Sequence, residues 1–357
     1  ETYAEENGFK FVAIDEDTDT TEIVAQGKCG DATWTLDSNG TLIISEAGMG
    51  DGSTQNINKN LYNPTSLFID YSSLITNVIV NEGITWIDMG LFKDLTELQS
   101  VILPESLKII QPYAFQNCKK LTEINIPENV YVIKNDVFTN TAWFNSKLEE
   151  SPLVIVNDIV IDGKKCKGDV EIPYGVTAIS ESAFEKCSDI TSVKIPETVT
   201  KIPYLAFAGC TSLKSVELSN GIKELGKLCF YSCTSLETIN IPDSVEFIDT
   251  YALINCLSLK EIEIHENTSL EEQSIGSYYE EKHLHKISDF TIKGYNNSHA
   301  QVYAKYNGFN FVALDGDNTS TTDTTTTTTQ AVSTEKGDAN CDGNVNMADA
   351  VMIMQSL

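Results

Sequence analysis

The 357-residue sequence lacks the short motifs that mark common catalytic and nucleotide-binding sites. It contains no G-x-S-x-G, no H-E-x-x-H, no P-loop and no G-x-G-x-x-G. Of its few histidines, only His283 and His285 are close enough in sequence to share a metal, and their polar surroundings favour a surface position. Acidic pairs such as Glu149/Glu150 are expected on solvated loops. We therefore expect no enzyme activity.

Basic residues are scarce, with 24 Lys and Arg against 52 Asp and Glu, which gives a formal net charge of −28. A chain this acidic is a poor ligand for nucleic acid or anionic membranes. No apolar run is long enough to span a membrane, and no signal peptide is visible. We expect a mature form, or a part of a longer protein, that works outside the cell.

A repeat of 23 residues organises most of the chain. Three successive units begin at Ile190, Leu213 and Leu236, with apolar residues at offsets 0, 3, 5, 9, 12 and 17 from the first residue. The same frame extends to units that begin at positions 75, 98, 121, 144, 167 and 259, and only the unit at 144 breaks the pattern. A fixed period of this length predicts a solenoid.

The repeat also predicts how each unit folds. Alternation at offsets 3 and 5 predicts a short strand whose apolar residues face inward, and proline at offset 6 ends the strand because it has no amide hydrogen. Offsets 9 and 12 return the chain beneath the core, and phenylalanine at offset 17 closes the coil. One such coil cannot bury its apolar residues alone, but stacked coils share one core.

Five of the nine cysteines occupy offset 20 of the repeat. They are Cys118, Cys187, Cys210, Cys233 and Cys256. We expect them to be free thiols that act as small apolar residues, because they stack at one buried position of the solenoid. Cys29, Cys166, Cys229 and Cys341 lie outside this ladder and show no C-x-x-C spacing.

The pattern L-x-x-I-x-I-P-x-x-V-x-x-I-x-x-x-A-F-x-x-C, over roughly residues 75 to 314, resembles the bacterial BspA-like leucine-rich repeats. This resemblance implies a β-rich repeat solenoid, an α/β leucine-rich repeat with 23-residue coils, that is curved and has a parallel sheet on one face. It also implies a secreted or cell-surface bacterial protein used in adhesion and protein binding. Abundant free thiols in an exported protein would suit an anaerobic habitat.

The segments that flank the repeat define the domain boundaries. We expect an N-terminal cap and irregular first coil over 23–74, the solenoid over 75–264 and a C-terminal cap over 265–314. Within the first cap, Thr33–Leu36 and Thr41–Ile44 around Asn39-Gly40 predict a hairpin that covers the open end of the first coil. The unit at 144 includes a second hairpin, about 153–163, around Asn157-Asp158. We expect it to protrude from the coil as a tolerated insertion, and a partner-binding projection is the less favoured alternative.

Residues 3–14 repeat the sequence of residues 303–314 at eight of twelve positions. The second copy is expected to close the solenoid with a short helix and a last strand. The first copy, within 1–14, is then the remnant of a preceding repeat-domain cap, followed by a linker over 15–22; alternatively, it adds a strand to its own domain. Residues 315–336 are rich in threonine and predict a second linker.

Residues 337–357 contain a candidate calcium loop, Asp338–Asp349. Oxygen-bearing side chains fall at loop positions 1, 3, 5, 9 and 12, glycine lies at position 6, and a backbone carbonyl is available at position 7. Such a shell of oxygens suits Ca²⁺. A chance acidic loop is the alternative.

The same loop resembles the first repeat of a dockerin, the module that docks onto cohesins in cellulosome scaffolds. The resemblance assigns calcium to Asp338, Asn340, Asp342, Asn344 (through its carbonyl), Asn346 and Asp349. It assigns cohesin contacts to Met347 and Ala348. Dockerins have two such repeats and this sequence shows one, so we interpret the C-terminus as truncated.

On the predicted sheet, the outward residues lie at offsets 2 and 4. They are Glu123, Asn125, Ser192, Lys194, Ser215, Glu217, Thr238, Asn240, Glu261 and Glu263. This face has no aromatic ring for stacking on sugars, so it favours a protein ligand over a polysaccharide. The leading hypothesis is a non-catalytic binding or adhesion module tethered by its dockerin. The alternatives are a polysaccharide-binding accessory module and, more weakly, part of an enzyme with an upstream catalytic domain.

Overall fold

The structure is a computed structural model, and it describes residues 21–46, 53–54 and 66–316. The candidate calcium loop, residues 1–14 and nearly all of the threonine-rich linker lie outside the described residues. The chain divides into two compact units. Unit 1 comprises residues 1–131 and 136–145, and unit 2 comprises residues 132–135 and 146–357. Each unit is described by itself.

Unit 1 begins with an antiparallel sheet that leads into the repeat. β1 (Ile23–Cys29), β2 (Ala32–Asp37) and β3 (Thr41–Glu46) pair in order, and β3 then pairs in parallel with β5 (Asn77–Val80). The sheet continues in parallel through β7 (Ser100–Ile102) to β9 (Glu123–Ile124). Trp34 of β2 lies edge-on to the buried Phe68 ring, at 5.3 Å between centroids. The predicted hairpin is therefore confirmed, and it covers the first coil.

The turn of this hairpin has three residues between the strands. The Asp37 carboxylate accepts hydrogen bonds from the backbone N–H groups of Asn39 and Thr41, at 2.9 and 2.8 Å. Gly40 has a φ of +81°, which a residue with a side chain rarely adopts. The first coil that follows is irregular, since Thr41 pairs with Asn77, 36 residues further on, where a regular coil needs 23.

A second parallel series in unit 1 comprises β4 (Ser53–Thr54), β6 (Trp86–Ile87) and β8 (Ile109–Ile110), with a short 3-10 helix, η1 (Ile69–Tyr71), before β5. In the repeat frame, β8 lies at offsets 11 and 12, on the return path of the coil. The sequence predicted a parallel sheet on one face only. The second series exists because the apolar residue at offset 12 is buried and its backbone pairs with the next coil, as in Ile87 and Ile110.

The aberrant unit at 144 differs from the prediction. α2 (Ala142–Glu150) occupies the positions where a strand would follow β9. β11 (Val154–Val156) and β12 (Ile159–Asp162) form the predicted hairpin, and Asn157 and Asp158 both have positive φ, as a two-residue type I′ turn requires. The hairpin does not protrude, because all four residues of β12 are buried and β12 pairs in parallel with β14 (Ala178–Ile179).

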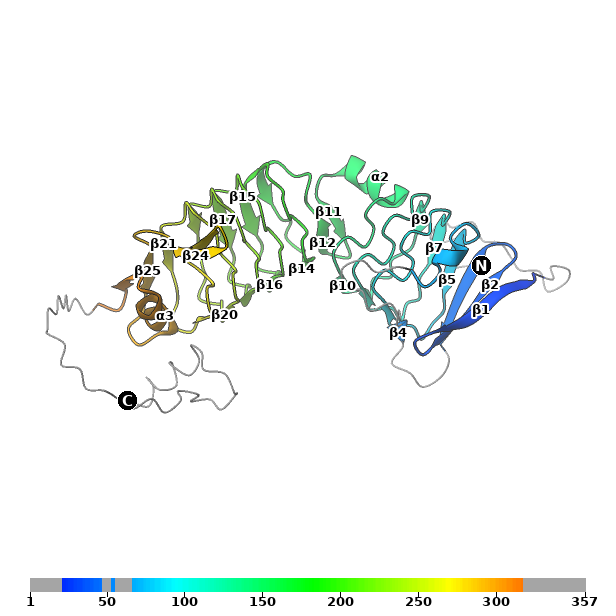
Figure 1. Cartoon of the computed structure of the whole chain (residues 1–357), viewed down its shortest axis with the longest axis horizontal. Coiled ribbons are helices and arrows are strands. Elements are labelled where there is room, and N and C mark those ends of the chain that lie inside the picture. Colours follow the sequence, from blue (N-terminus) through cyan, green and yellow to red (C-terminus); the bar gives the residue numbers. More distant parts are fainter. Residues whose placement is uncertain (1–20, 47–52, 55–65, 317–357) are drawn as a thin grey trace. The chain divides into compact units, whose positions relative to one another are not determined.

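Unit 2 contains two parallel series of strands on opposite sides of its coils (Figure 1). The front series is β13 (Gly168–Glu171), β15 (Ile190–Ile195), β17 (Ser215–Leu218) and β19 (Thr238–Ile239). The back series is β16 (Lys201–Ile202), β18 (Glu224–Leu225), β20 (Phe247–Ile248) and β22 (Ser269–Leu270). β10 (Val132–Ile133) also belongs to unit 2. In-register pairs such as Val193↔Val216 and Ile202↔Leu225 confirm the 23-residue frame.

The phenylalanine rings at offset 17 of the repeat stack on one another in neighbouring coils. In unit 2, the Phe207 ring lies 4.7 Å from Phe184 and 5.3 Å from Phe230, with interplanar angles of 16° and 8°. In unit 1, the rings of Phe92 and Phe115 stack in the same way, 5.2 Å apart. All are fully buried, so the offset-17 positions form the aromatic part of the core as predicted.

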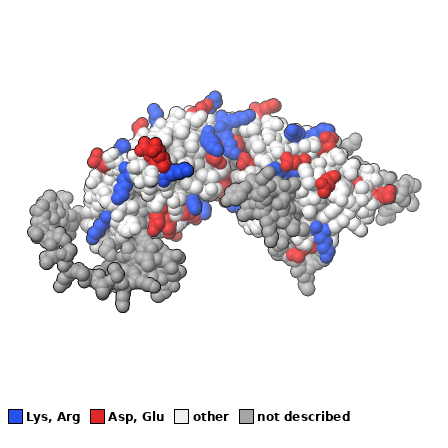
Figure 2. Space-filling model, in the orientation of Figure 1, with Lys and Arg blue, Asp and Glu red and all other residues white. Residues whose placement is uncertain are grey.

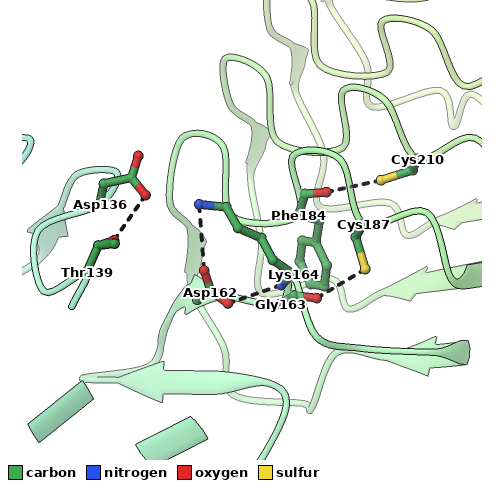
Figure 3. A network of polar contacts seen from close by, with 8 residues as sticks. All are labelled: Asp136, Thr139, Asp162, Gly163, Lys164, Phe184, Cys187 and Cys210. Atoms are coloured by element: carbon green, nitrogen blue, oxygen red, sulfur yellow. Dashed lines mark hydrogen bonds and ion pairs between the residues drawn. The ribbon is translucent and has the colours of Figure 1, made fainter. Parts of the chain in front are cut away.

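The ladder cysteines are free and buried. Their thiols also donate to backbone carbonyls of the preceding coil, as in Cys210 to Phe184 O at 3.2 Å and Cys233 to Phe207 O at 3.2 Å. Where the unit at 144 lacks its phenylalanine, the Phe184 ring lies against Gly163, and Cys187 donates to the Gly163 carbonyl at 3.4 Å (Figure 3). A side chain at Gly163 would place its Cβ 2.0 Å from the Phe184 ring.

The flanks of the coils are built from turns, and α2 and α3 are the only α-helices of the described residues. The turns need left-handed backbone at offsets 15 and 19. Examples are Tyr113 and Asn117, Ser182 and Lys186, Leu228 and Ser232, and Tyr251 and Asn255. Each such non-glycine residue costs roughly 1 kcal/mol, which backbone hydrogen bonds between coils offset. The described repeat is thus a β-solenoid, which confirms the β-rich solenoid expected from the sequence, and turns stand where the α/β form would have helices.

The C-terminal cap of unit 2 contains β21 (Glu261–Glu263), β25 (Thr291–Gly294) and β26 (Asn310–Ala313), which pair in parallel, and α3 (His299–Asn307). Tyr303 of α3 is fully buried, and its hydroxyl donates to Ile275 O at 3.0 Å. The predicted closing helix and last strand are confirmed. A further hairpin, β23 (Ser277–Glu280) and β24 (His283–Lys286), lies in the last coil and was not predicted; it places His283 and His285 on the surface.

Candidate binding surface on the front sheet of unit 2

The outer face of the front sheet in unit 2 is fixed by the alternation of each strand. In β15 and β17, Val193 and Val216 point into the core, while the residues on either side of them face solvent or lie half-buried. Because neighbouring coils pair in register, residues at one offset line up in rows across the sheet. The offset-2 row has the small hydroxyl residues Ser192, Ser215 and Thr238 between two carboxylates, and the offset-4 row is charged except at Asn240.

A depression of about 720 Å³ lies on this face. Its lining includes the outward residues Ser192, Lys194, Ser215, Glu217, Thr238, Asn240, Glu261 and Glu263, together with Glu237, His265 and Lys293. Eight of the ten residues predicted for the sheet face thus line one surface. The remaining two, Glu123 and Asn125, lie on β9 and directly after it in unit 1.

The charges on this face alternate along the offset-4 row, which reads Glu171, Lys194, Glu217, Asn240, Glu263 and Lys293 in coil order. The Lys194 ammonium forms an ion pair with Glu171 at 3.1 Å, and Lys293 forms one with Glu261 at 2.6 Å. The hydrogen bond and charge of Glu171, with a smaller contribution from Glu217, raise the pKa of Lys194. Figure 2 shows lysine and acidic side chains interspersed on the visible face of unit 2.

The hydroxyl residues of the offset-2 row are partly engaged within the sheet. The Asp169 carboxylate accepts hydrogen bonds from Ser192 Oγ at 2.6 Å and from Thr191 Oγ1 at 2.9 Å. These donors, Ser192 first, lower the pKa of Asp169 because they stabilise its charged form. Ser215 and Thr238 form no such hydrogen bond among the described residues.

Asn240 binds the backbone of the preceding coil. Its Oδ1 accepts from the Leu218 N–H at 2.7 Å, and its Nδ2 donates to the Leu218 carbonyl at 2.7 Å. Asn125 does the same to Leu103 in unit 1, at 2.8 and 3.0 Å. The strand before each asparagine, β9 or β19, has only two residues. It ends there because the asparagine side chain makes the hydrogen bonds to the preceding coil that backbone groups make in longer strands.

The front sheet is interrupted after β19. β19 pairs with β17 along one edge, while β21 pairs with β25 and so belongs to a separate sheet. In the described residues, no backbone hydrogen bond joins β19 to β21. Thr238 and Asn240 lie on one side of this interruption, Glu261 and Glu263 on the other, and all four line the depression.

The hydroxyl, amide and charged groups of this arrangement suit recognition of a polar ligand. No group of three or more metal-ligating side chains occurs in the part of the chain that the structure describes. Sequence reasoning missed Glu237, His265 and Lys293, since they lie at other offsets or beyond the regular repeat. His265 Nε2 lies 2.7 Å from the Asp243 carboxylate, at the edge of the depression.

Comparison with known proteins identifies the family. Six copies of the BspA type leucine-rich repeat region match residues 55–158 and 164–291, which is more than half of the chain. The chain therefore belongs to the BspA-type leucine-rich repeat family. Proteins of this family are typically bacterial surface or secreted proteins without catalytic activity, which makes this chain a repeat protein of the binding or adhesion class. No curated protein matches the chain.

Several solved structures are similar to the chain at low identity. A leucine-rich repeat protein from Bacteroides ovatus is 19% identical over 79% of this chain and 65% of its own, with a TM-score of 0.36. The chain thus spans less than two thirds of that protein. The pneumococcal vaccine antigen PcpA is 14% identical over 82% of this chain and 99% of its own, with a TM-score of 0.40. A leucine-rich cell surface protein from Faecalibacterium prausnitzii is 21% identical over 71% and 92%, with a TM-score of 0.26.

None of the described helices has the length and apolar character needed to cross a membrane.

Proposed function

We propose that the chain is a secreted, non-catalytic module that binds a protein partner on the front sheet of unit 2. The observation that supports this proposal is the depression lined by small hydroxyl residues and by the carboxylates of Glu217, Glu237, Glu261 and Glu263. Its outward side chains offer hydrogen bonds and charge but no aromatic platform. Polysaccharide-binding modules usually stack sugars on such platforms, so this face favours a protein.

A pair of bulky variants tests this proposal. Thr238→Trp places a bulky ring in the depression, whereas Thr200→Trp places the same side chain at an exposed position outside it. Both proteins are assayed against extracellular proteins of the source bacterium and against insoluble cellulose, xylan and pectin. We expect protein binding that Thr238→Trp abolishes and Thr200→Trp retains. Binding to a polysaccharide alone would replace the proposal with an accessory role in cell-wall degradation.

We further propose that the C-terminal residues tether this module to a cellulosome-like scaffold through a calcium-dependent dockerin–cohesin interaction. The support is the loop sequence Asp338–Asp349, whose oxygen-bearing residues occupy the positions that bind Ca²⁺ in dockerin repeats. Met347 and Ala348 would contact the cohesin. The full chain is titrated with a panel of cohesins in calcium and in EGTA. Calcium-dependent binding that is lost in Asp338→Ala/Asp342→Ala is expected, and no binding to any cohesin would remove the tether from the account.

A further inference from the structure

The offset-4 row on the front sheet of unit 2 lacks one cation. Along the row, carboxylates and ammonium groups alternate except at Asn240, where an uncharged amide lies between Glu217 and Glu263. Asn240 is held in place by its two hydrogen bonds to Leu218. We infer that a lysine or, better, arginine side chain of a protein partner occupies this position, above Asn240 and between the two carboxylates.

The ion pairs on the sheet leave these carboxylates available. Lys194 is committed to Glu171 and Lys293 to Glu261. Among the described residues, neither Glu217 nor Glu263 forms an ion pair of its own. Both side chains are exposed, so water solvates their carboxylates until a partner covers them. A cation that arrives between them therefore gains two charge-assisted contacts without breaking an existing pair.

The chemistry of this position also favours a guanidinium group. Glu217 and Glu263 lie at the same offset of the repeat, in the coils on either side of Asn240, and both line the depression. Arginine can donate to both carboxylates at once because its N–H groups form a rigid fork, whereas lysine offers a point charge.

The interrupted sheet gives a second, independent reason to place the ligand here. Because β19 and β21 are not joined by backbone hydrogen bonds, the floor of the depression beside Asn240 keeps main-chain polar groups that a regular ladder would use. An extended peptide brings its own amide and carbonyl groups along with the side chain. The inference therefore specifies an extended, cationic protein segment, and it rests on the proposed protein-binding function.

The test uses two nine-residue peptides in a glycine–serine background, one with a central arginine and one with citrulline, its neutral isostere. Each is titrated into the ¹⁵N-labelled full chain, and the side-chain amide of Asn240 is followed by NMR. We expect saturable chemical-shift changes with the arginine peptide, and an affinity that falls at high salt. The citrulline peptide should bind at least tenfold more weakly.

Paired variants provide the control. Glu217→Gln/Glu263→Gln should lower the affinity for the arginine peptide at least tenfold. Glu128→Gln/Glu149→Gln removes the same charge from exposed residues outside the depression and should leave this affinity unchanged. Unperturbed spectra elsewhere show that the variants fold. Equal binding of arginine and citrulline peptides, an unaffected double variant or no shift at Asn240 would overturn the inference.

Three further outcomes bear on this inference and on the proposed function on which it rests. Titration with CaCl₂ alone that reproduces the Asn240 shifts would show a general cation site, contrary to the inference. If the arginine peptide fails but Thr238→Trp still abolishes partner binding, the inference is wrong and the protein-binding function stands. If Thr238→Trp also has no effect on a bound partner, the function itself is wrong.

Discussion

Each ladder cysteine supplies a small buried volume and one weak hydrogen-bond donor. Cys256 donates to the carbonyl of Phe230, 26 residues earlier, at 3.3 Å, and Cys118 donates to the Phe92 carbonyl in the same way. Alanine would fill part of the volume but leave the carbonyl without this donor. A disulfide would remove the donor altogether. The free thiol therefore fills the buried volume and also gives the carbonyl its hydrogen-bond donor.

Burial raises the pKa of Cys118 to about 12 and that of Cys187 to about 11. At pH 8 the reactive thiolate is then on the order of 0.1% or less of either residue, and access of reagent is blocked as well. We expect iodoacetamide to leave the five ladder cysteines unmodified in the native protein and to label all of them in 6 M guanidinium chloride. Peptide mass spectrometry reads both states, and rapid native labelling of Cys118 would contradict this burial.

Asn240 illustrates a residue whose structural role the sequence did not reveal. Its outward offset predicted a ligand contact, yet its side chain makes two hydrogen bonds to the backbone of Leu218. Asn240→Ala should lower the free energy of unfolding by about 1–3 kcal/mol, because the Leu218 backbone groups lose their partners. Denaturant unfolding measures the loss. Ser215→Ala, in the same depression, is the control and should change stability by less than about 0.5 kcal/mol; equal effects of the two would contradict the assigned role.

The elements of the repeat are short because each coil is closed by turns and stacked on its neighbours. Most strands in the back series have two residues, which no isolated sheet could stabilise. Their stability comes from the stacked phenylalanines and the continuous apolar core of unit 2. Loss of one ring therefore removes packing contacts from both neighbouring coils.

Phe207→Ala should reduce the free energy of unfolding by about 3–5 kcal/mol, since it leaves a cavity between the rings of Phe184 and Phe230. Phe207→Leu should cost clearly less, because the chain itself uses Leu253 at the equivalent offset. Chemical denaturation of the two variants gives the ranking. A larger loss for leucine than for alanine would show that the ring stack does not control the stability of these coils.

Periodicity predicted the elements that recur and failed where the pattern is local. The front strands, the phenylalanine stack and the cysteine ladder follow from offsets that repeat five or more times. β1 was missed because Ile23–Cys29 alternates only weakly and includes Gly27, whose lack of a side chain makes room for Trp34. The hairpin β23–β24 was missed because its turn, Glu281-Lys282, lacks the usual glycine or asparagine, although both residues have positive φ.

The candidate site was predictable in part for the same reason. Outward offsets identified the residues that line the depression, because alternation in a strand is a strict rule. The interruption between β19 and β21 was not predictable, since Ile262 and Ile264 keep the repeat pattern and only the pairing changes. The contribution of Lys293 depends on the insertion of β23–β24, which shifts β25 by seven residues relative to the regular frame: Glu261 pairs with Thr291, 30 residues on instead of 23.

At the scale of the whole molecule, the chain combines a high negative charge with a surface of alternating charges on one sheet. A net charge of −28 keeps copies apart and favours partners that bring cations. The two units repeat the same coil, but the depression found here belongs to unit 2 alone. The account therefore assigns partner binding to the front sheet of unit 2.

Site-specific photocrosslinking tests this assignment most directly. A photoreactive amino acid is placed at Thr238, inside the depression, or at Thr200, an exposed residue outside it, and the full chain is irradiated with the extracellular proteins of its source organism. The account predicts one discrete protein adduct from Thr238, suppressed by excess of the arginine peptide, and none from Thr200. Adducts of equal yield from both positions, or adducts from Thr200 alone, would contradict the assignment of binding to the front sheet.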